Sequence, residues 1–268
     1  MACKICKNIP NQKNLGSINA GRVYSKNNYP LGKYDSEIEY YLCNYCQFIY
    51  SPTWDNKDTH FWEKEIYNED YIKYVDPDFS GKRSKDIAPV LKEIIHILAK
   101  KYKTNLSILD YGSGQSLLSK ELKKLTPSIH VESYDPYAVN NTNSKTNYDL
   151  IIAIEVFEHA VDVHMLMQDI VDRTNNDSII IFTTKLISSS RLNLEWDYIA
   201  PRNGHISIFS KQALKKLASI YNLYFINLIF FNFFSFKKLT ALEKVFLFFK
   251  IIKFKLIFHI SRLIYKNV

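Results

Sequence analysis

The chain has 268 residues, 47% of them hydrophobic and 15% aromatic, which is enough to bury an ordinary core and excludes an intrinsically disordered protein. This length can hold one ordinary α/β domain with a small appendage. The formal net charge is +8, but residues 211–268 hold eleven lysines and arginines against one acid, so the rest is near neutral and the overall charge does not indicate nucleic-acid binding.

The cysteines form two Cys-x-x-Cys pairs in the first fifth of the chain: Cys3, Cys6, Cys43 and Cys46. Two such pairs supply the four thiolates of a tetrahedral zinc site, with no position left open for a substrate. Reduced thiols without metal are the alternative, and disulfides are less favoured because no secretory signal precedes them. We therefore predict a structural zinc-binding module, of the zinc-ribbon kind, over residues 1–55.

Residues 56–100 hold two helical patterns and are predicted to form a helical lid or linker. The first pattern is aromatic and ends near Asp76. The second runs from Ile87 to Tyr102, with its apolar residues at helical spacing.

From Leu106 onward, short apolar runs alternate with helical patterns. The predicted strands are 106–111, 129–134, 148–154, 178–183 and 223–231, and the predicted helices are 115–125 and 211–220. This alternation predicts an α/β fold with a doubly wound, Rossmann-like, mostly parallel sheet that helices cover on both faces. Its domain spans residues 101–235.

Small and acidic residues follow the first two strands of that sheet. Gly112 and Gly114 lie where a strand turns into a helix, so the backbone can approach a ligand closely. Asp135 follows the next strand and can accept both hydroxyls of a ribose. Because Leu117 stands where a diphosphate-binding turn needs a third glycine, a ligand with a ribose and no diphosphate is the better fit.

The stretches Leu109–Gln115 and Tyr148–His159, together with Asp135, resemble class I S-adenosylmethionine-dependent methyltransferases, and the match extends through Gly204–Ser210. The cysteine-bearing N-terminus is similar to the subfamily that modifies sugars and other small metabolites. The resemblance implies S-adenosylmethionine as cofactor. The cofactor-binding residues that it implies are Asp110, Gly112, Ser113, Gly114, Asp135, Pro136 and Glu155.

Two features depart from the family pattern. Ser116 replaces the third small residue of the glycine-rich motif, which serine can do because it is small. Residues 136–147 are too few for the usual helix, strand and adenine-contacting acid. The adenine contact is therefore not assigned.

The sequence Glu155-x-x-Glu158-His159 follows the third strand, and His205 lies in a later loop that can converge on it. His159 and His205 are predicted catalytic residues together with Glu158, with a histidine taking the proton of an acceptor hydroxyl. The ubiquinone-pathway and small-RNA 3′-end O-methyltransferases are similar here and hold a divalent ion. A divalent ion bound by Glu155, Glu158, His159 and His205 is therefore the alternative.

Residues 194–203 are expected to form a loop above the acceptor pocket. Trp196, Tyr198 and Arg202 in this loop suit a sugar or a phosphorylated ligand, and packing of the loop explains them equally well.

Residues 236–268 predict a basic, apolar C-terminal helix. Lys250, Lys253 and Lys255 interrupt the apolar run and argue against a membrane span. The helix is expected to pack on the fold or on a second subunit, as in a dimer, or to lie on an anionic membrane surface as a peripheral contact.

Taken together, the sequence predicts a cytoplasmic O-methyltransferase for a sugar, a nucleotide-linked sugar or another phosphorylated small metabolite, acting in surface-glycan or capsule polysaccharide decoration. Oxygen is preferred as the methylated atom because the site offers a base and no cysteine nucleophile. The alternative is an RNA or nucleotide 2′-O-methyltransferase, or an RNA-binding zinc module on a methyltransferase-like scaffold. No nucleic-acid partner is expected, because the charge around the site is near neutral.

Overall fold

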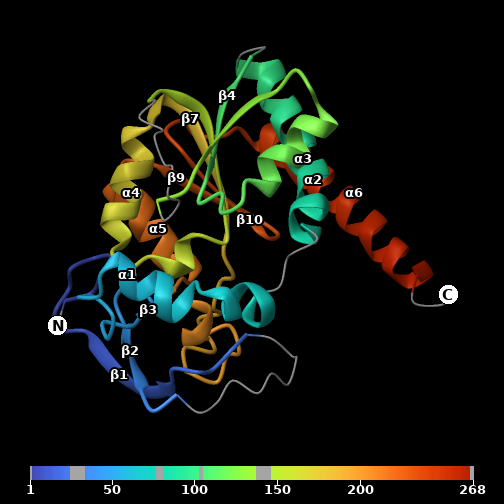
Figure 1. Cartoon of the computed structure of the whole chain (residues 1–268). Helices are drawn as coiled ribbons and strands as arrows, with labels where there is room; N and C mark the ends of the chain where they lie inside the picture. Colours follow the sequence, from blue (N-terminus) through green and yellow to red (C-terminus); the bar gives the residue numbers. More distant parts are fainter. Residues whose placement is uncertain (1, 25–33, 77–80, 103–104, 137–145, 266–268) are drawn as a thin grey trace.

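The computed structural model describes residues 2–24, 34–76, 81–102, 105–136 and 146–265. Two sheets organise them: a six-stranded central sheet with helices on both sides, and a four-stranded sheet below it that the N-terminal segment begins (Figure 1). The segment between the second and third predicted strands falls mostly outside the described residues, so its expected lack of a strand is not tested.

The central sheet has the order β5-β4-β6-β7-β10-β9. The pairings among β5, β4, β6 and β7 are parallel, and those of β10 with β7 and β9 are antiparallel. This confirms the mostly parallel sheet. The strands are β4 (Ser107–Tyr111), β5 (His130–Tyr134), β6 (Tyr148–Ile154), β7 (Thr174–Thr183), β9 (Tyr224–Leu228) and β10 (Phe231–Ser235).

The last strand predicted over 223–231 is present but ends earlier: β9 stops at Leu228, and a hairpin leads from it into β10, which was not predicted. The turn lies at Ile229, whose backbone φ of 59° is in the left-handed region. Glycine or asparagine normally occupies such a position, so an apolar turn between two apolar strands is not visible in the sequence.

Alternate residues of the central strands face two separate apolar cores. Ile108 and Ile152 pack with α2, α3 and α6, whereas Leu109 and Ile151 pack with α4 and α5. The period of two along a strand produces this division, which covers both faces of the sheet. The helices are α2 (Lys82–Tyr102), α3 (Leu117–Leu125), α4 (Val163–Asp172), α5 (Lys211–Ile220) and α6 (Ala241–Tyr265).

The aromatic segment before α2 forms three short helical pieces rather than one helix. Asn68 interrupts it, donating from Nδ2 to the Lys64 carbonyl and accepting at Oδ1 from the Tyr71 amide, as Asn side chains do at turns. We call residues 59–76 the lid segment. Its pieces are α1 (Thr59–Phe61), η1 (Trp62–Ile66) and η2 (Tyr71–Val75).

The second sheet is antiparallel, with the order β1-β2-β3-β8. Its fourth strand comes from far along the chain, because Ile208 pairs with Ile49 and Ser207 with Tyr50. The N-terminal segment is therefore tied by backbone hydrogen bonds to the loop that precedes α5. The strands are β1 (Gln12–Asn19), β2 (Glu37–Cys43), β3 (Phe48–Tyr50) and β8 (Ser207–Ile208). No helix in the described part of the chain combines the length and apolarity that crossing a membrane requires.

Candidate active site

The turn between β4 and α3 contains the predicted glycines and brings backbone close to a neighbouring loop. Gly112 has a φ of 68°, and a Cβ at this position would lie 2.5 Å from the Cγ2 atom of Val156. Its amide and that of Ser113 both donate to the Tyr134 carbonyl, at 2.8 and 3.1 Å. Only glycine satisfies both the conformation and the close approach at position 112.

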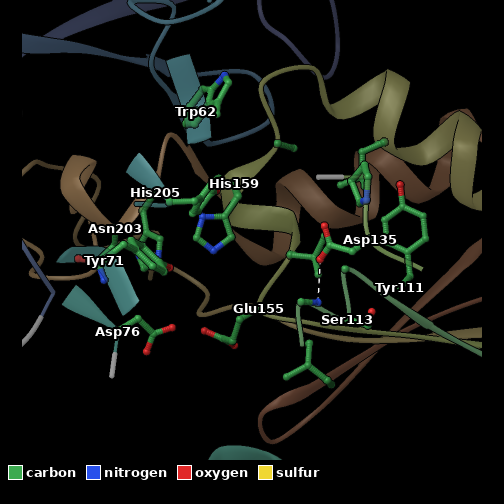
Figure 2. A pocket seen from close by; sticks show the side chains of 18 of the residues that line it. Trp62, Tyr71, Asp76, Tyr111, Ser113, Asp135, Glu155, His159, Asn203 and His205 are labelled. Carbon is green, nitrogen blue, oxygen red and sulfur yellow. Dashed lines mark hydrogen bonds between the residues drawn. The ribbon is translucent and has the colours of Figure 1, made fainter. Parts of the chain in front are cut away.

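Two carboxylates lie beside this turn. Asp135 accepts a hydrogen bond from the Gly114 amide at its Oδ2 atom, at 2.7 Å, which fixes the carboxylate at the cavity wall (Figure 2). Asp110 is 3% exposed, and its Oδ2 atom has no partner among the described residues. Burial raises the pKa of the Asp110 carboxyl to about 7. A buried carboxyl with one oxygen left unpartnered suits a ligand that brings hydrogen-bond donors or positive charge.

A cavity of about 1320 Å³ connects the glycine turn, the end of β6 and the lid segment. Such a volume accommodates a cofactor and a small acceptor together. The nine predicted site residues that line it are Asp110, Gly112, Ser113, Gly114, Asp135, Pro136, Glu155, His159 and His205.

Glu155 and His159 reach the cavity because the chain turns sharply where β6 ends. Glu155 has a φ of 54°, a conformation that side-chain-bearing residues rarely adopt, and its amide donates to the carbonyl and the hydroxyl of Thr183. A single 3₁₀ turn, η3 (Phe157–His159), follows. Figure 2 shows both side chains pointing into the cavity.

His159 and His205 form an imidazole pair with ring centroids 5.1 Å apart. Burial lowers the pKa of each, and for His205 the lowering is large, with His159 as a further cause. The Nδ1 atom of His205 lies 2.7 Å from the Tyr198 carbonyl and is assigned as its donor, which leaves Nε2 as the acceptor atom. Gly204, with a φ of 81°, brings its backbone against His159, because a Cβ there would lie 3.0 Å from its Nδ1 atom.

Glu158, the third predicted catalytic residue, does not line the cavity. It is fully buried and accepts a hydrogen bond from the Tyr198 hydroxyl at 2.6 Å. Burial, and then the neighbouring charge of Glu155, raise the pKa of its carboxyl well above the ordinary value. Burial therefore favours the protonated form of this carboxyl over the carboxylate. One possible metal-ligand atom from each of Glu158, His159 and His205 nevertheless lies within 4.8 Å of the other two. Glu155, the fourth predicted ligand, is not part of this group.

The four cysteine sulfurs gather at one point, all within 4.8 Å of one another. The distances from Cys3 to Cys46 and from Cys6 to Cys43 are both 3.6 Å. Tetrahedral zinc with bonds of about 2.3 Å places its sulfurs about 3.8 Å apart, so the geometry fits that metal. The hydrogen bond from Cys46 lowers the pKa of the Cys3 thiol to about 5, which makes this sulfur a thiolate at neutral pH.

Residues between the first two cysteines contact the loop that follows His159. Lys4 donates from Nζ to the Val161 carbonyl at 3.0 Å and forms an ion pair with Asp55. The carbonyl of Ile5 lies 2.9 Å from Nε2 of His164, on the first turn of α4. The cysteine cluster is thus attached to the segment that carries the cavity histidine.

Comparison with protein families decides the class. The chain matches a family model described as a methyltransferase domain over residues 83–228, more than half of its length. The chain belongs to this methyltransferase family. The match confirms the predicted enzyme class, an S-adenosylmethionine-dependent methyltransferase. A search of curated protein sequences found no match.

Three solved structures that are similar to this chain share little sequence identity with it. A candidate O-methyltransferase of Nostoc punctiforme has a TM-score of 0.44 at 11% identity, with 59% of this chain and 58% of that chain covered. The plantazolicin methyltransferase BpumL, solved with SAH, has a TM-score of 0.45 at 16% sequence identity, with 66% of this chain and 83% of that chain covered. The pyocyanin biosynthetic protein PhzM has a TM-score of 0.42 at 12% sequence identity, with 64% of this chain and 61% of that chain covered. The methyltransferase thus spans little more than half the length of the Nostoc protein.

The lid segment supplies cavity residues that the sequence did not indicate as functional. Trp62, Tyr71 and Asp76 line the cavity, and Figure 2 shows the carboxylates of Asp76 and Glu155 pointing toward each other. The aromatic residues of the lid segment follow a pattern that predicted a helix and no ligand contact. The lid segment and the end of β6 are far apart in sequence and meet only in the folded protein. No spacing of residues within either segment therefore indicates this side of the cavity.

The arginine and the tyrosine of the loop over 194–203 pack into the fold, while Asp197 and Asn203 line the cavity. Arg202 is fully buried and donates to the Ile66 carbonyl at 2.7 Å and to Asn68 Oδ1 at 2.9 Å. Tyr198 is 1% exposed. The packing alternative for this loop is the one that the structure supports, and the guanidinium holds the lid segment in place.

Proposed function

We propose that this methyltransferase transfers the methyl group of S-adenosylmethionine to a hydroxyl oxygen of a sugar or sugar-like small metabolite. The observation that carries the proposal is the imidazole of His159, which lies in the same cavity as the glycine turn and whose pKa is lowered by burial. A neutral imidazole is a suitable base for an alcohol proton. No cysteine lines that cavity among the described residues.

The donor is proposed to bind at the glycine turn. Asp135 would accept its ribose hydroxyls, and Asp110 would accept from its amino group. When bound, S-adenosylmethionine supplies an electrophilic methyl group on a positively charged sulfur. S-adenosylhomocysteine is therefore expected to raise the melting temperature, because it binds the folded state. Asp135→Ala should weaken its binding. Stabilisation by NAD and not by S-adenosylhomocysteine would contradict this assignment.

The charges of the cavity favour an acceptor without a phosphate near the reacting hydroxyl. Only two of the described lining residues are lysine or arginine, Lys57 and Arg83. The guanidinium of Arg202, which the sequence suggested as a phosphate ligand, instead donates its hydrogen bonds to the lid segment. The eight acids that line the cavity are Asp55, Asp76, Asp110, Asp135, Glu155, Asp162, Asp169 and Asp197. Such a lining disfavours phosphate esters and RNA, admits neutral acceptors and attracts amine-bearing ones.

Labelled methyl transfer tests the acceptor class directly. Purified enzyme is incubated with donor carrying a labelled methyl group and with matched pairs of sugars that differ only by a phosphate or a nucleotide. Transfer to the unphosphorylated member, with weaker transfer to its partner, is the expected result. Transfer to RNA alone, with steep salt dependence, would instead support the nucleotide alternative.

We also propose that the cysteine cluster holds one structural zinc ion. When bound, the ion would join β2, the turn before β3 and the first residues of the chain through four thiolates. Elemental analysis should find about one zinc per chain. Four thiols that titrate freely in metal-free, folded protein would contradict the proposal.

A divalent ion at Glu158, His159 and His205 is the second candidate for the chemistry, supported by their ligand atoms lying within 4.8 Å. Against it, the raised pKa of Glu158 favours the protonated acid, a poor ligand. A weak chelator, with the fold checked by circular dichroism, separates the two. Loss of activity that added magnesium restores would favour the ion, and full activity favours proton transfer by a histidine.

A further inference from the structure

Helix α6 has apolar residues on two opposite sides, and only one side is covered. Leu247 and Ile251 are fully buried against the core that also includes α2. Four residues on the other side are exposed: Leu242 by 64%, Val245 by 47%, Phe246 by 55% and Phe249 by 64%. These four, which we call the apolar stripe, follow the spacing i, i+3, i+4 and i+7 that places side chains on one helix face.

The position of α6 leaves this stripe accessible. The helix starts beside α2 and β9 and then runs outward, beyond the layers of the central sheet (Figure 1). Lys250 forms an ion pair with Glu93 of α2, which fixes the orientation of the first turns. Two exposed phenylalanines on a fixed helix face are unusual for a surface that meets only water.

The charge of the same segment indicates what covers it. Residues 236–268 contain eight lysines and arginines and a single acid, Glu243. Lys253 is exposed and falls on the same helix face as Phe246 and Phe249. A second copy of this helix would bring two strongly basic segments together, whereas anionic lipid headgroups complement lysines and accept aromatic side chains at their boundary.

We propose that the apolar stripe of α6 binds the surface of an anionic membrane, with the helix lying in the plane of the headgroups. The proposed contact is peripheral, with the helix along the lipid surface and not across it. The proposal is independent of the acceptor. It would hold the catalytic domain at a lipid surface whether the substrate is free or attached to a lipid.

Flotation with lipid vesicles tests the proposal on the full chain. Wild-type protein should float with vesicles of phosphatidylcholine mixed with phosphatidylglycerol, and should not float with phosphatidylcholine alone. Binding should weaken as salt is added, because headgroup attraction is screened. The double variant Phe246→Ser, Phe249→Ser should bind at least ~10-fold more weakly, since both apolar side chains leave the interface.

A matched control removes equally exposed apolar residues elsewhere. Ile9 and Ile220 are 64% and 41% exposed, and Ile9→Ser, Ile220→Ser should bind vesicles like wild type. Unchanged melting temperature and S-adenosylhomocysteine binding in all variants would show that the fold is intact. The proposal is overturned if wild type ignores anionic vesicles or the control loses as much binding. It is also overturned if the stripe variant converts a lipid-free dimer to monomer without changing vesicle binding.

Discussion

Glu158 and His159 are adjacent in sequence but have opposite surroundings, and the difference assigns them different roles. The single turn η3 directs His159 into the cavity and Glu158 into the core, where Tyr198 donates to it. Burial raises the pKa of this carboxyl well above its ordinary value, which favours the protonated form. A group in that state cannot take a proton from an acceptor. It can orient Tyr198, whose carbonyl meets His205.

Glu158→Gln should therefore change turnover very little. The amide reproduces the shape of the protonated acid and still accepts from Tyr198, so turnover is expected within ~3-fold of wild type. Glu158→Ala should instead lower stability by ~2–4 kcal/mol, because it leaves a cavity in the core and removes the 2.6 Å acceptor of the Tyr198 hydroxyl. Steady-state kinetics and thermal unfolding measure the two effects. A loss of turnover above ~100-fold in the Gln variant would identify Glu158 as a base or metal ligand.

His159 predicts the pH dependence of the reaction. Its pKa lies below the ordinary value of about 6.5, so the imidazole stays neutral as the pH falls to that point and is protonated only below it. The acid limb of kcat/KM should therefore begin below pH ~6.5. His159→Ala should lower turnover ~100-fold, leave S-adenosylhomocysteine affinity nearly unchanged, and regain rate as hydroxide rises.

His130 offers the matched control, since its side chain is 71% exposed and its Nε2 atom lies 3.1 Å from Glu132 Oε1, with no part in the cavity lining. His130→Ala should keep the wild-type profile. Full activity in the double variant His159→Ala, His205→Ala would remove proton transfer from the mechanism and leave positioning of the reactants as the catalytic device.

At the level of elements, the turn between β4 and α3 depends on its contact with the turn after β6. Gly112→Ala would place a Cβ 2.5 Å from Val156 Cγ2 in a backbone conformation with positive φ. We expect S-adenosylhomocysteine to bind at least ~10-fold more weakly, because the turn must shift. Gly114→Ala has a φ of 50° but no atom within 4 Å, so it should cost less. Calorimetry compares the two.

A second substitution distinguishes local crowding from general unfolding. Val156→Ala removes the crowding methyl groups and should restore part of the affinity lost in Gly112→Ala, while the cost of the positive φ remains. If the double variant binds no better than Gly112→Ala, the contact between the two turns is not what positions the donor.

These elements also show what the sequence could reveal. Strands β4 and β6 contain short apolar runs, so their positions and the turns after them were predictable, and with them Gly112. Strand β5 is less apolar, and Asp135 after it was found from its spacing to the glycine turn. The hairpin turn at Ile229 was not predictable, because it lacks the glycine or asparagine that usually marks such a turn. Helix α4 was missed although Asp162 caps it and Val163, Met167 and Ile170 follow helical spacing. Asp76 could not be found either, since its meeting with Glu155 depends on how the lid segment folds back over the sheet.

At the scale of the whole molecule, the N-terminal sheet is attached to the histidine side of the cavity. Tyr40 donates from its hydroxyl to the His205 carbonyl at 2.9 Å, and the amide of Ser51 donates to the Ile206 carbonyl at 2.9 Å. Lys4, between two cysteines, holds the Val161 carbonyl. The glycine turn is instead held by hydrogen bonds from its amides to Tyr134 and Asp135.

Removing the metal should therefore impair the two halves of the cavity unequally. Zinc-depleted protein, or Cys43→Ser, is expected to bind S-adenosylhomocysteine within ~3-fold of wild type as long as it stays folded, because the donor turn has its own supports. Turnover should fall at least ~10-fold, because His205 and the loop after His159 lose their alignment. Calorimetry and labelled methyl transfer on the same samples measure both quantities.

Lys4→Met separates the attachment from the metal itself. The four thiolates remain, so zinc content should stay at about one per chain. The Val161 carbonyl and Asp55 lose their partner, so turnover should fall toward that of the depleted protein, and Lys4→Arg should recover part of it. If Lys4→Met keeps both zinc and full turnover while depletion abolishes activity, the metal acts through the fold as a whole. If depletion also abolishes S-adenosylhomocysteine binding, the cavity unfolds as one unit.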